Sequence, residues 1–129
     1  MFELKYLGHA GWLIENSGIK ILCDPWLNTS GCFYNSWHQF PDNSHIDVDD
    51  VLRGVNILYI SHSHLDHYDE HTLAKMNKKT QVLVADFNDP ILKNSLDRLG
   101  FENVRELSES EIYAVGALQI KILKEENHL

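Results

Sequence analysis

The segment VNILYISHSHLDH, residues 55–67, constrains the fold more than any other stretch of the chain. It opens with a continuous apolar run, which is typical of a strand inside a sheet that is covered on both faces. Histidines and an aspartate follow that strand directly, at His62, His64, Asp66 and His67. We therefore expect an α/β fold in which this cluster lies at the carboxyl end of a buried strand.

The spacing of the cluster indicates a metal centre. His62 and His64 are two residues apart, so both rings can point the same way on an extended or tightly turned backbone, while Asp66 and His67 turn round to a second position. These side chains suit zinc, iron or manganese, and such sites with an open coordination position are catalytic. The alternative is a solvated, histidine-rich loop, which does not account for the apolar strand directly before it.

Apolar periodicity elsewhere predicts a β-rich, then βαβα, then β-rich order of elements. The segment 24–46 has no regular pattern, and a loop of that length is a candidate lid. The expected strands are 2–7, 12–15, 19–23, 55–60, 81–85 and short pieces within 103–123, and the expected helices are 47–54, 69–77 and 89–100. In the last helix, Asp89 is the expected cap, and the core-facing stripe is expected at Ile91, Leu92, Ser95, Leu96 and Leu99.

Composition limits the classes of function. The length of 129 residues fits one domain, residues 1–129. Eleven lysines and arginines stand against nineteen aspartates and glutamates, and they are scattered, so nucleic-acid binding is not expected. A small-molecule substrate remains open, even an anionic one, because bound divalent metal would offset negative charge locally. The sequence predicts no transmembrane segment, and its two widely spaced cysteines favour the cytoplasm.

Beyond these patterns, HSHLDH matches the H-x-H-x-D-H signature, and the chain resembles the metallo-β-lactamase superfamily along essentially its whole length. YLGHAGWLIENSGIKILCDPWL resembles the opening of the ascorbate-phosphate lactonase and N-acylphosphatidylethanolamine phospholipase D branch. CDPWLNTSGCFYNSWHQFP, with LYISHSHLDHYD, resembles the metallo-β-lactamase-like part of CMP-N-acetylneuraminate hydroxylase. The resemblance implies the N-terminal half of an αββα sandwich.

The resemblance also implies two divalent metal ions, with zinc expected first and iron or manganese as alternatives. His62 and His64 would bind the first ion, and Asp66 and His67 the second. Asp66 would in addition orient an activated hydroxide and pass its proton to the leaving group. Asp24 matches an aspartate that holds a metal-binding histidine from behind, which fixes the tautomer of that ring.

Three further residues are weaker candidates on the substrate side. His9, in GHA, falls at the mouth of the site in this branch, although a histidine at a strand end is an equal alternative. Trp37 and His38 belong to the aromatic segment CFYNSWHQF. For that segment as a whole we favour packing onto the domain over a lid or a membrane contact, because large exposed apolar patches are unusual.

A complete family member supplies a third histidine for the first metal, a bridging aspartate and a final histidine from its second half, roughly another 80 to 120 residues. After the expected helix 69–77, His128 is the only histidine in the sequence, available as a third ligand or as a frayed terminal residue. We therefore expect the N-terminal piece of a longer protein, or else a half-domain completed by another chain. Uncovered sheet surface would then favour self-association or a partner chain.

Three functions are consistent with the sequence. The first is a metal-dependent hydrolase, in which metal-activated hydroxide attacks an ester, lactone, amide or phosphodiester. The second is a di-iron or Rieske-partnered oxygenase or hydroxylase, although the paired C-x-H and C-x-x-H motifs of a Rieske cluster do not occur in this chain. The third is a non-catalytic half-domain or binding module.

Overall fold

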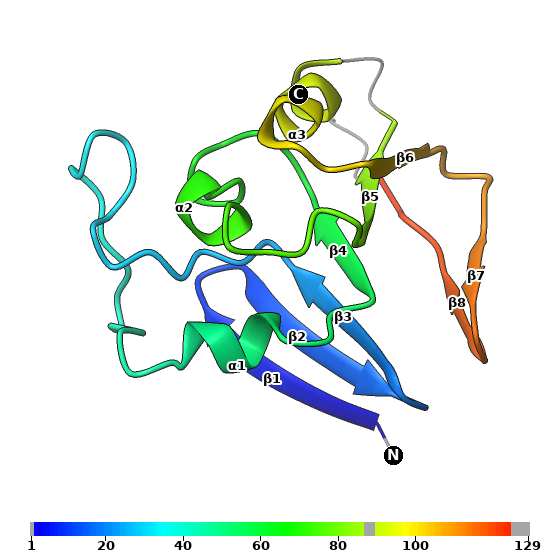
Figure 1. Ribbon diagram of the computed structural model, residues 1–129, viewed down its shortest axis with the longest axis horizontal. Helices are drawn as coiled ribbons and strands as arrows, with labels where there is room; N and C mark the ends of the chain where they lie inside the picture. Colours follow the sequence, from blue (N-terminus) through cyan, green and yellow to red (C-terminus); the bar gives the residue numbers. More distant parts are fainter. Residues whose placement is uncertain (1, 87–89, 125–129) are drawn as a thin grey trace.

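The computed structural model describes residues 2–86 and 90–124, and its centre is a mixed six-stranded sheet in the order β1-β2-β3-β4-β5-β6 (Figure 1). The first three strands are antiparallel and β3 to β6 are parallel. Their bounds are β1 Phe2–Gly8, β2 Gly11–Asn16, β3 Ile19–Cys23, β4 Ile57–Ile60, β5 Gln81–Ala85 and β6 Asn103–Leu107. The α/β class predicted from the sequence is therefore correct.

Helices α1 (Val48–Leu52), α2 (Glu70–Leu73) and α3 (Ile91–Leu99) cover one face of this sheet. Between them and the strands lies an apolar core in which Leu58 of β4 contacts no solvent. Burial of this strand on both faces explains why VNILYI is apolar without alternation. The core residues are Leu7, Leu13, Leu22, Leu27, Val51, Leu58, Ile60, Tyr68, Leu73, Met76, Val82, Val84, Leu92, Leu96 and Phe101.

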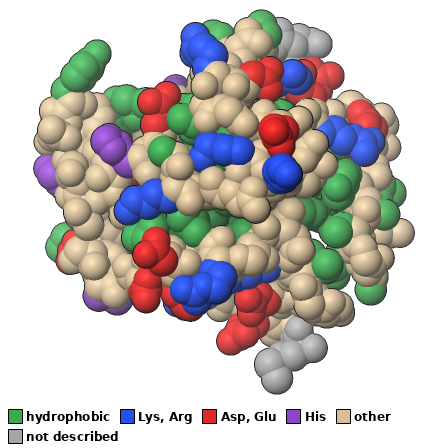
Figure 2. All heavy atoms as spheres, viewed as in Figure 1, with side chains coloured by type: hydrophobic (Ala, Val, Ile, Leu, Met, Phe, Trp, Pro, Cys, Tyr) green, Lys and Arg blue, Asp and Glu red, His purple; other side chains and the backbone are tan. Residues whose placement is uncertain are grey.

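The opposite face is covered only in part. A hairpin of β7 (Tyr113–Val115) and β8 (Leu118–Ile120) packs over the β3, β4 and β5 part of that face. Figure 2 shows hydrophobic side chains at the right of the view, where this hairpin lies. At the β1 and β2 end, four large apolar side chains of the same face are exposed, and we call them the β1–β2 apolar face: Phe2, Leu4, Tyr6 and Trp12.

Two details of the predicted helices are wrong. The helix expected at 69–77 is regular only over Glu70–Leu73, and turns follow it. Nζ of Lys78 binds the carbonyl oxygens of Leu73, Ala74 and Met76, each at 2.9 Å, so these carbonyls do not continue a helix. In α3, Ile91 is 58% exposed and does not belong to the core-facing stripe. The predicted cap Asp89 lies outside the described residues, and Gly100 ends the helix at a φ of 104° as expected.

Candidate metal centre

The site begins where two parallel strands end side by side. Asp24 follows β3 and Ser61 follows β4, and the backbone N–H of Asp24 donates to the carbonyl oxygen of Tyr59 at 3.0 Å. Asp24 is buried and has a φ of 40°, in the left-handed region that aspartate tolerates better than most residues. The carboxyl ends of β3 and β4 thereby bring Asp24 to Ser61, 37 residues further along the chain, directly before the histidine motif.

Ser61 connects Asp24 to the histidines. Oδ1 of Asp24 accepts the backbone N–H of Ser61 at 2.8 Å, and Oδ2 accepts the Ser61 hydroxyl at 2.6 Å. Because the Ser61 hydroxyl donates its proton to Asp24, Oγ of Ser61 accepts the Nδ1–H of His62, at 2.8 Å. Oδ2 of Asp24 also accepts from Nδ1 of His67 at 2.7 Å. This network assigns both rings the Nδ1–H tautomer and leaves both Nε2 lone pairs free.

A tight turn brings the two halves of the motif together. The backbone N–H groups of His67 and Tyr68 both donate to the carbonyl oxygen of His64, at 2.9 and 2.7 Å. The turn is anchored by Tyr68, which is buried and donates its hydroxyl to the carbonyl oxygen of Ser95. As a result the ring centroids of His62 and His67 lie 4.0 Å apart, and those of His62 and His64 lie 4.7 Å apart.

Asp66 is the second buried acid of the site, after Asp24. Its Oδ2 lies 2.7 Å from Nε2 of His9 and 3.4 Å from Nε2 of His67. Burial raises the pKa of this carboxyl, but the hydrogen bond from His9, a backbone hydrogen bond and the nearby His67 lower it, and the net direction is downward. Asp66 is therefore available as an anionic oxygen ligand at neutral pH.

The charge state of His62 is also suited to metal binding. Partial burial lowers its pKa below 6.5, and the neighbouring His67 and His64 lower it further against the opposing effect of Asp24 and Asp66. A neutral imidazole is the form that binds metal.

The donor set of the site fits a divalent metal. One oxygen of Asp66 and ring nitrogens of His9 and His67 all lie within 4.8 Å of one another, and imidazole with carboxylate suits zinc, manganese and iron. The free Nε2 atoms of His62 and His67 add to that fit. Of the predicted ligands, Asp66 and His67 belong to this group of donors. His62 and His64 do not belong to it, but the His62 ring lies next to it, with centroids 4.0 Å from His67 and 4.7 Å from His64, while His128 lies outside the described residues.

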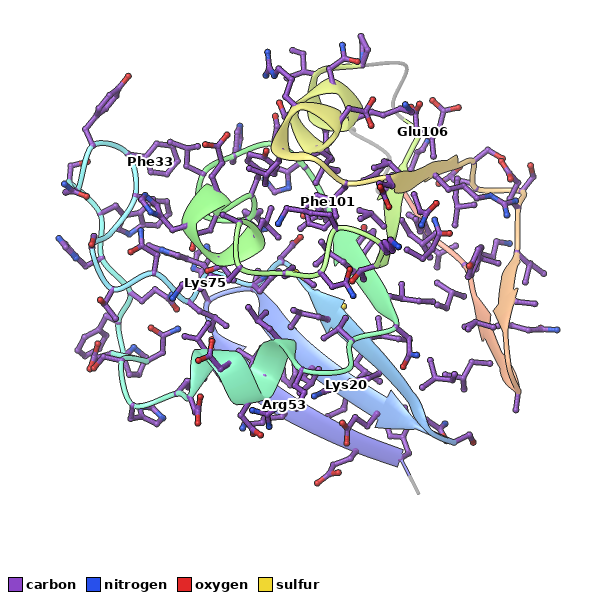
Figure 3. The ribbon with its side chains drawn as sticks, viewed as in Figure 1. Lys20, Phe33, Arg53, Lys75, Phe101 and Glu106 are labelled. Carbon is purple, nitrogen blue, oxygen red and sulfur yellow. The ribbon has the colours of Figure 1, made fainter. Side chains whose placement is uncertain are left out.

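The long segment between β3 and α1 is fixed to the site rather than free. Trp26 is buried, and the amide Nδ2 of Asn43 donates to the carbonyl oxygens of Trp26 and Leu7, at 3.1 and 2.9 Å. Further along, Cys32 and Trp37 pair across a short turn. That turn lies beside α2, where Figure 3 labels Phe33, and a cavity of about 230 Å³ separates the turn from Asp69, Glu70 and His71.

The three weaker sequence candidates have different outcomes. His9 contacts Asp66, and the ring of Trp37 lies against His9 with centroids 5.5 Å apart. His38 is exposed, and Nε2 of its ring contacts the carbonyl oxygen of Asn35 within the same loop. The packing favoured for the aromatic segment is correct for Phe33, which stacks on Trp37, and wrong for Tyr34 and Phe40, which are fully exposed.

Two residues of the site have no role in the sequence-based interpretation. The sequence feature that could have identified Ser61 is its position between the end of the apolar strand and His62. Its hydroxyl is the atom through which Asp24 fixes the tautomer of His62. Trp26 has no comparable signal, although its ring lies 5.4 Å from that of His9.

The chain belongs to the β-lactamase superfamily, in its metallo-β-lactamase form. The family model described as "Beta-lactamase superfamily domain" matches residues 3–128. This assignment agrees with the mixed sheet and with the histidine motif at the end of β4. The lactonase and phospholipase D branches suggested by the opening of the sequence are not confirmed, and metal-dependent hydrolases are among the relatives instead.

Two curated relatives differ in their described chemistry. A Mycolicibacterium smegmatis protein provisionally named as a Rieske 2Fe-2S iron-sulfur protein is 43% identical over 126 residues, which are 94% of this chain and 24% of that protein. A UPF0173 metal-dependent hydrolase of Aeropyrum pernix is 37% identical over 86 residues, or 66% of this chain and 30% of the relative. The chain therefore spans about a quarter to a third of these relatives.

Two solved structures share the fold of this chain. A possible metal-dependent hydrolase from Veillonella parvula shares the fold with a TM-score of 0.71, at 20% identity, over 94% of this chain and 47% of that chain. CmlA, a diiron β-hydroxylase from Streptomyces venezuelae, also has a TM-score of 0.71, at 28% identity, over 95% of this chain and 24% of its own. Within the described residues, no helix has the length and apolar character needed to span a membrane.

Proposed function

We propose that the protein is a metal-dependent hydrolase acting on a small molecule with an ester, lactone, amide or phosphodiester bond. The observation that carries this proposal is the network of Asp24 and Ser61, which leaves the Nε2 atoms of His62 and His67 free, with Nε2 of His67 3.4 Å from the Asp66 carboxylate. Free imidazole nitrogens and an anionic oxygen are the donors of hydrolytic metal centres. The family and the UPF0173 relative support the same class.

In this proposal His62 and His64 hold one divalent ion, and Asp66 and His67 hold a second. Two such ions supply Lewis-acid activation of a water molecule at neutral pH. Asp24 fixes the ring of His67 from behind, so that Nε2 faces Asp66. Asp66 would orient the attacking water through its carboxylate and accept or return a proton there. Zinc is the proposed metal, with iron and manganese as alternatives.

The first test is the metal-to-protein ratio of the purified protein, measured by elemental mass spectrometry. We expect about two zinc ions per chain, and we expect His64→Ala to lose at least one. In EDTA, where neither protein holds metal, the unfolding temperatures of the two should differ little. His71→Ala is the matched control, because His71 is exposed on α2 and outside the motif. Chromogenic lactone and phosphodiester substrates then test turnover. Because this chain supplies only part of the family's expected ligand set, turnover is measured with the second half of the fold present. Metal-loaded protein of that kind without turnover on any such bond would contradict the hydrolase assignment.

The second candidate function is oxidative. It is favoured by the 43% identical relative named for a Rieske cluster and by the diiron β-hydroxylase CmlA at 28% identity. The same donors, His62, His64, Asp66 and His67, would then hold iron. A ratio of two iron ions in protein purified without added metal would place this function ahead of hydrolysis.

We also propose that the chain is one part of a longer folded unit. The support is the β1–β2 apolar face, which remains exposed beside a face that β7 and β8 cover only partly. The chain covers 24% and 30% of the two curated relatives, which leaves chain enough in them to cover this face. A non-catalytic binding module is the alternative for the chain taken alone, and a metal ratio near zero would favour it. Localisation in the cytoplasm stays a prediction from the sequence.

A further inference from the structure

His9 is the one residue of the candidate centre that comes from the β1 and β2 hairpin, far from the histidine motif in sequence. Its Nε2 lies 2.7 Å from Oδ2 of Asp66, across 57 positions of the chain. Asp66 is buried, whereas the side chain of His9 is 30% exposed. The contact therefore joins a partly solvated ring to a buried acid of the site.

The ring of His9 is held in place by its neighbours. The residue has a φ of 51°, and its carbonyl oxygen accepts the hydroxyl of Tyr6 at 3.0 Å. Trp26 and Trp37 both contact the ring edge to face, with centroids 5.4 and 5.5 Å away and interplanar angles of 87° and 80°. These contacts fix the direction in which Nε2 points before any metal is bound.

The distance between Nε2 of His9 and Oδ2 of Asp66 is that of a hydrogen bond, and it is too short for two atoms that bind the same metal ion. Two ligands with bonds of about 2.0 to 2.1 Å to a tetrahedral zinc ion lie about 3.3 Å apart. His67 Nε2 meets this spacing, at 3.4 Å from Oδ2 of Asp66, but His9 Nε2 at 2.7 Å is too close. A distance of 2.7 Å is typical of a short N–H···O bond to a carboxylate.

We propose that His9 is a positioning residue, whose Nε2–H donates to Asp66 and fixes the orientation of that carboxylate toward the metal. This inference rests on the proposed metal centre. In it, His9 supports the ligand Asp66 and neither binds the metal nor contacts the substrate. A hydrogen bond of this kind holds a ligating carboxylate in one rotamer and so reduces the entropy lost on metal binding.

His9 also connects the long segment between β3 and α1 to the proposed metal centre. Trp26 and Trp37 are both in the segment between β3 and α1, and both contact His9. Asn43 ties that segment to Leu7, two residues before His9. A displacement of the loop would therefore move the ring of His9 and loosen Asp66.

The test compares His9→Gln with His9→Ala in a zinc titration against a competing chelator. Nε2 of glutamine is as many bonds from Cα as Nε2 of histidine, so His9→Gln keeps the donor but is a poor zinc ligand. We expect His9→Gln to bind zinc within about threefold of the unaltered protein, and His9→Ala to bind about 10 to 100-fold more weakly at the same stoichiometry. Loss of one metal ion in both variants would make His9 a ligand and overturn the proposal. Unchanged affinity in both would overturn it too.

A second measurement keeps this inference separate from the proposed function. In metal-free protein, ¹⁵N NMR of the imidazole nitrogens distinguishes the protonated from the unprotonated atom. We expect His9 to carry its proton on Nε2 in the unaltered protein, and we expect this Nε2–H proton to exchange with water faster in Asp66→Ala, where its acceptor is removed. If the protein binds no metal but the Nε2–H proton is protected by Asp66, the metal centre is wrong while the contact stands. A proton on Nδ1 of His9 would refute the positioning role whatever the metal content.

Discussion

Nδ1 of His67 and Oδ2 of Asp24 lie 2.7 Å apart, which joins the end of β3 to a turn that begins after β4. The same carboxylate oxygen accepts the hydroxyl of Ser61, which in turn contacts His62. One buried aspartate therefore sets the orientation of two imidazole rings.

Replacing Asp24 with asparagine should weaken metal binding by about 10 to 100-fold. The amide introduced by Asp24→Asn could still accept the backbone N–H of Ser61, but it would lack the anionic oxygen that receives both the Ser61 hydroxyl and the His67 ring. A chelator-competition titration measures the change. Asp97→Asn, at an exposed position of α3, is the control and should bind metal normally. Equal affinity in Asp24→Asn would contradict the role of Asp24.

The metal-free protein should lose stability as the pH falls through about 6.5, the ordinary pKa of histidine. The pKa of His62 is lowered in the folded state, chiefly by burial and then by His67 and His64. The unfolded chain therefore takes up this proton first on acidification, which favours unfolding. Above that range both states are neutral at His62 and the residue has no such effect.

Unfolding temperatures measured in EDTA from about pH 8 to pH 5.5 test this expectation. His62→Gln should show a shallower decline than the unaltered protein over the same range, because it has no proton to take up at that position. Identical pH profiles for the two proteins would refute the assigned direction.

Leu96→Ala should destabilise the fold by about 2 to 5 kcal/mol, because the substitution leaves a cavity between α3 and the sheet. Leu96 is fully buried in the helix-side core. Ile91→Ala in the same helix is the control, since Ile91 is 58% exposed and should cost far less. Urea unfolding followed by circular dichroism gives both values, and a similar cost at the two positions would contradict the observed face of α3.

The β1–β2 apolar face should make the isolated protein self-associate. Leu4 and Tyr6 are 54% and 52% exposed on an edge strand, where apolar side chains and unpaired backbone groups favour association. Light scattering across a range of concentrations should show oligomers, and Leu4→Glu should shift them toward the monomer. Lys5→Gln, on the opposite face of β1, should not. A monodisperse monomer at every concentration would refute the expectation.

Much of the fold could be predicted from local patterns. The strands at 19–23 and 81–85 are predicted at their observed bounds, because an apolar run closed by polar residues signals a buried strand. Ile91 is assigned to the wrong face because the side of α3 that meets the core runs through Leu92, Leu96 and Leu99, and Ile91 lies about 100° round the helix from Leu92. The helix after residue 69 is predicted too long because turns begin after Leu73, where Nζ of Lys78 binds the carbonyl oxygens of Leu73 and Ala74.

The sequence by itself determined the chemistry of the candidate centre. The spacing of His62, His64, Asp66 and His67 behind an apolar strand indicates ligand types and position, because side chains so close in sequence share one short turn. The resemblance also implied that Asp24 holds a metal-binding histidine from behind. Only the tertiary structure decided that this ring is His67 and that His9 contacts Asp66, across 43 and 57 positions of the chain. Such contacts depend on which strands lie side by side in the sheet, and the spacing of residues along a chain carries no information about that.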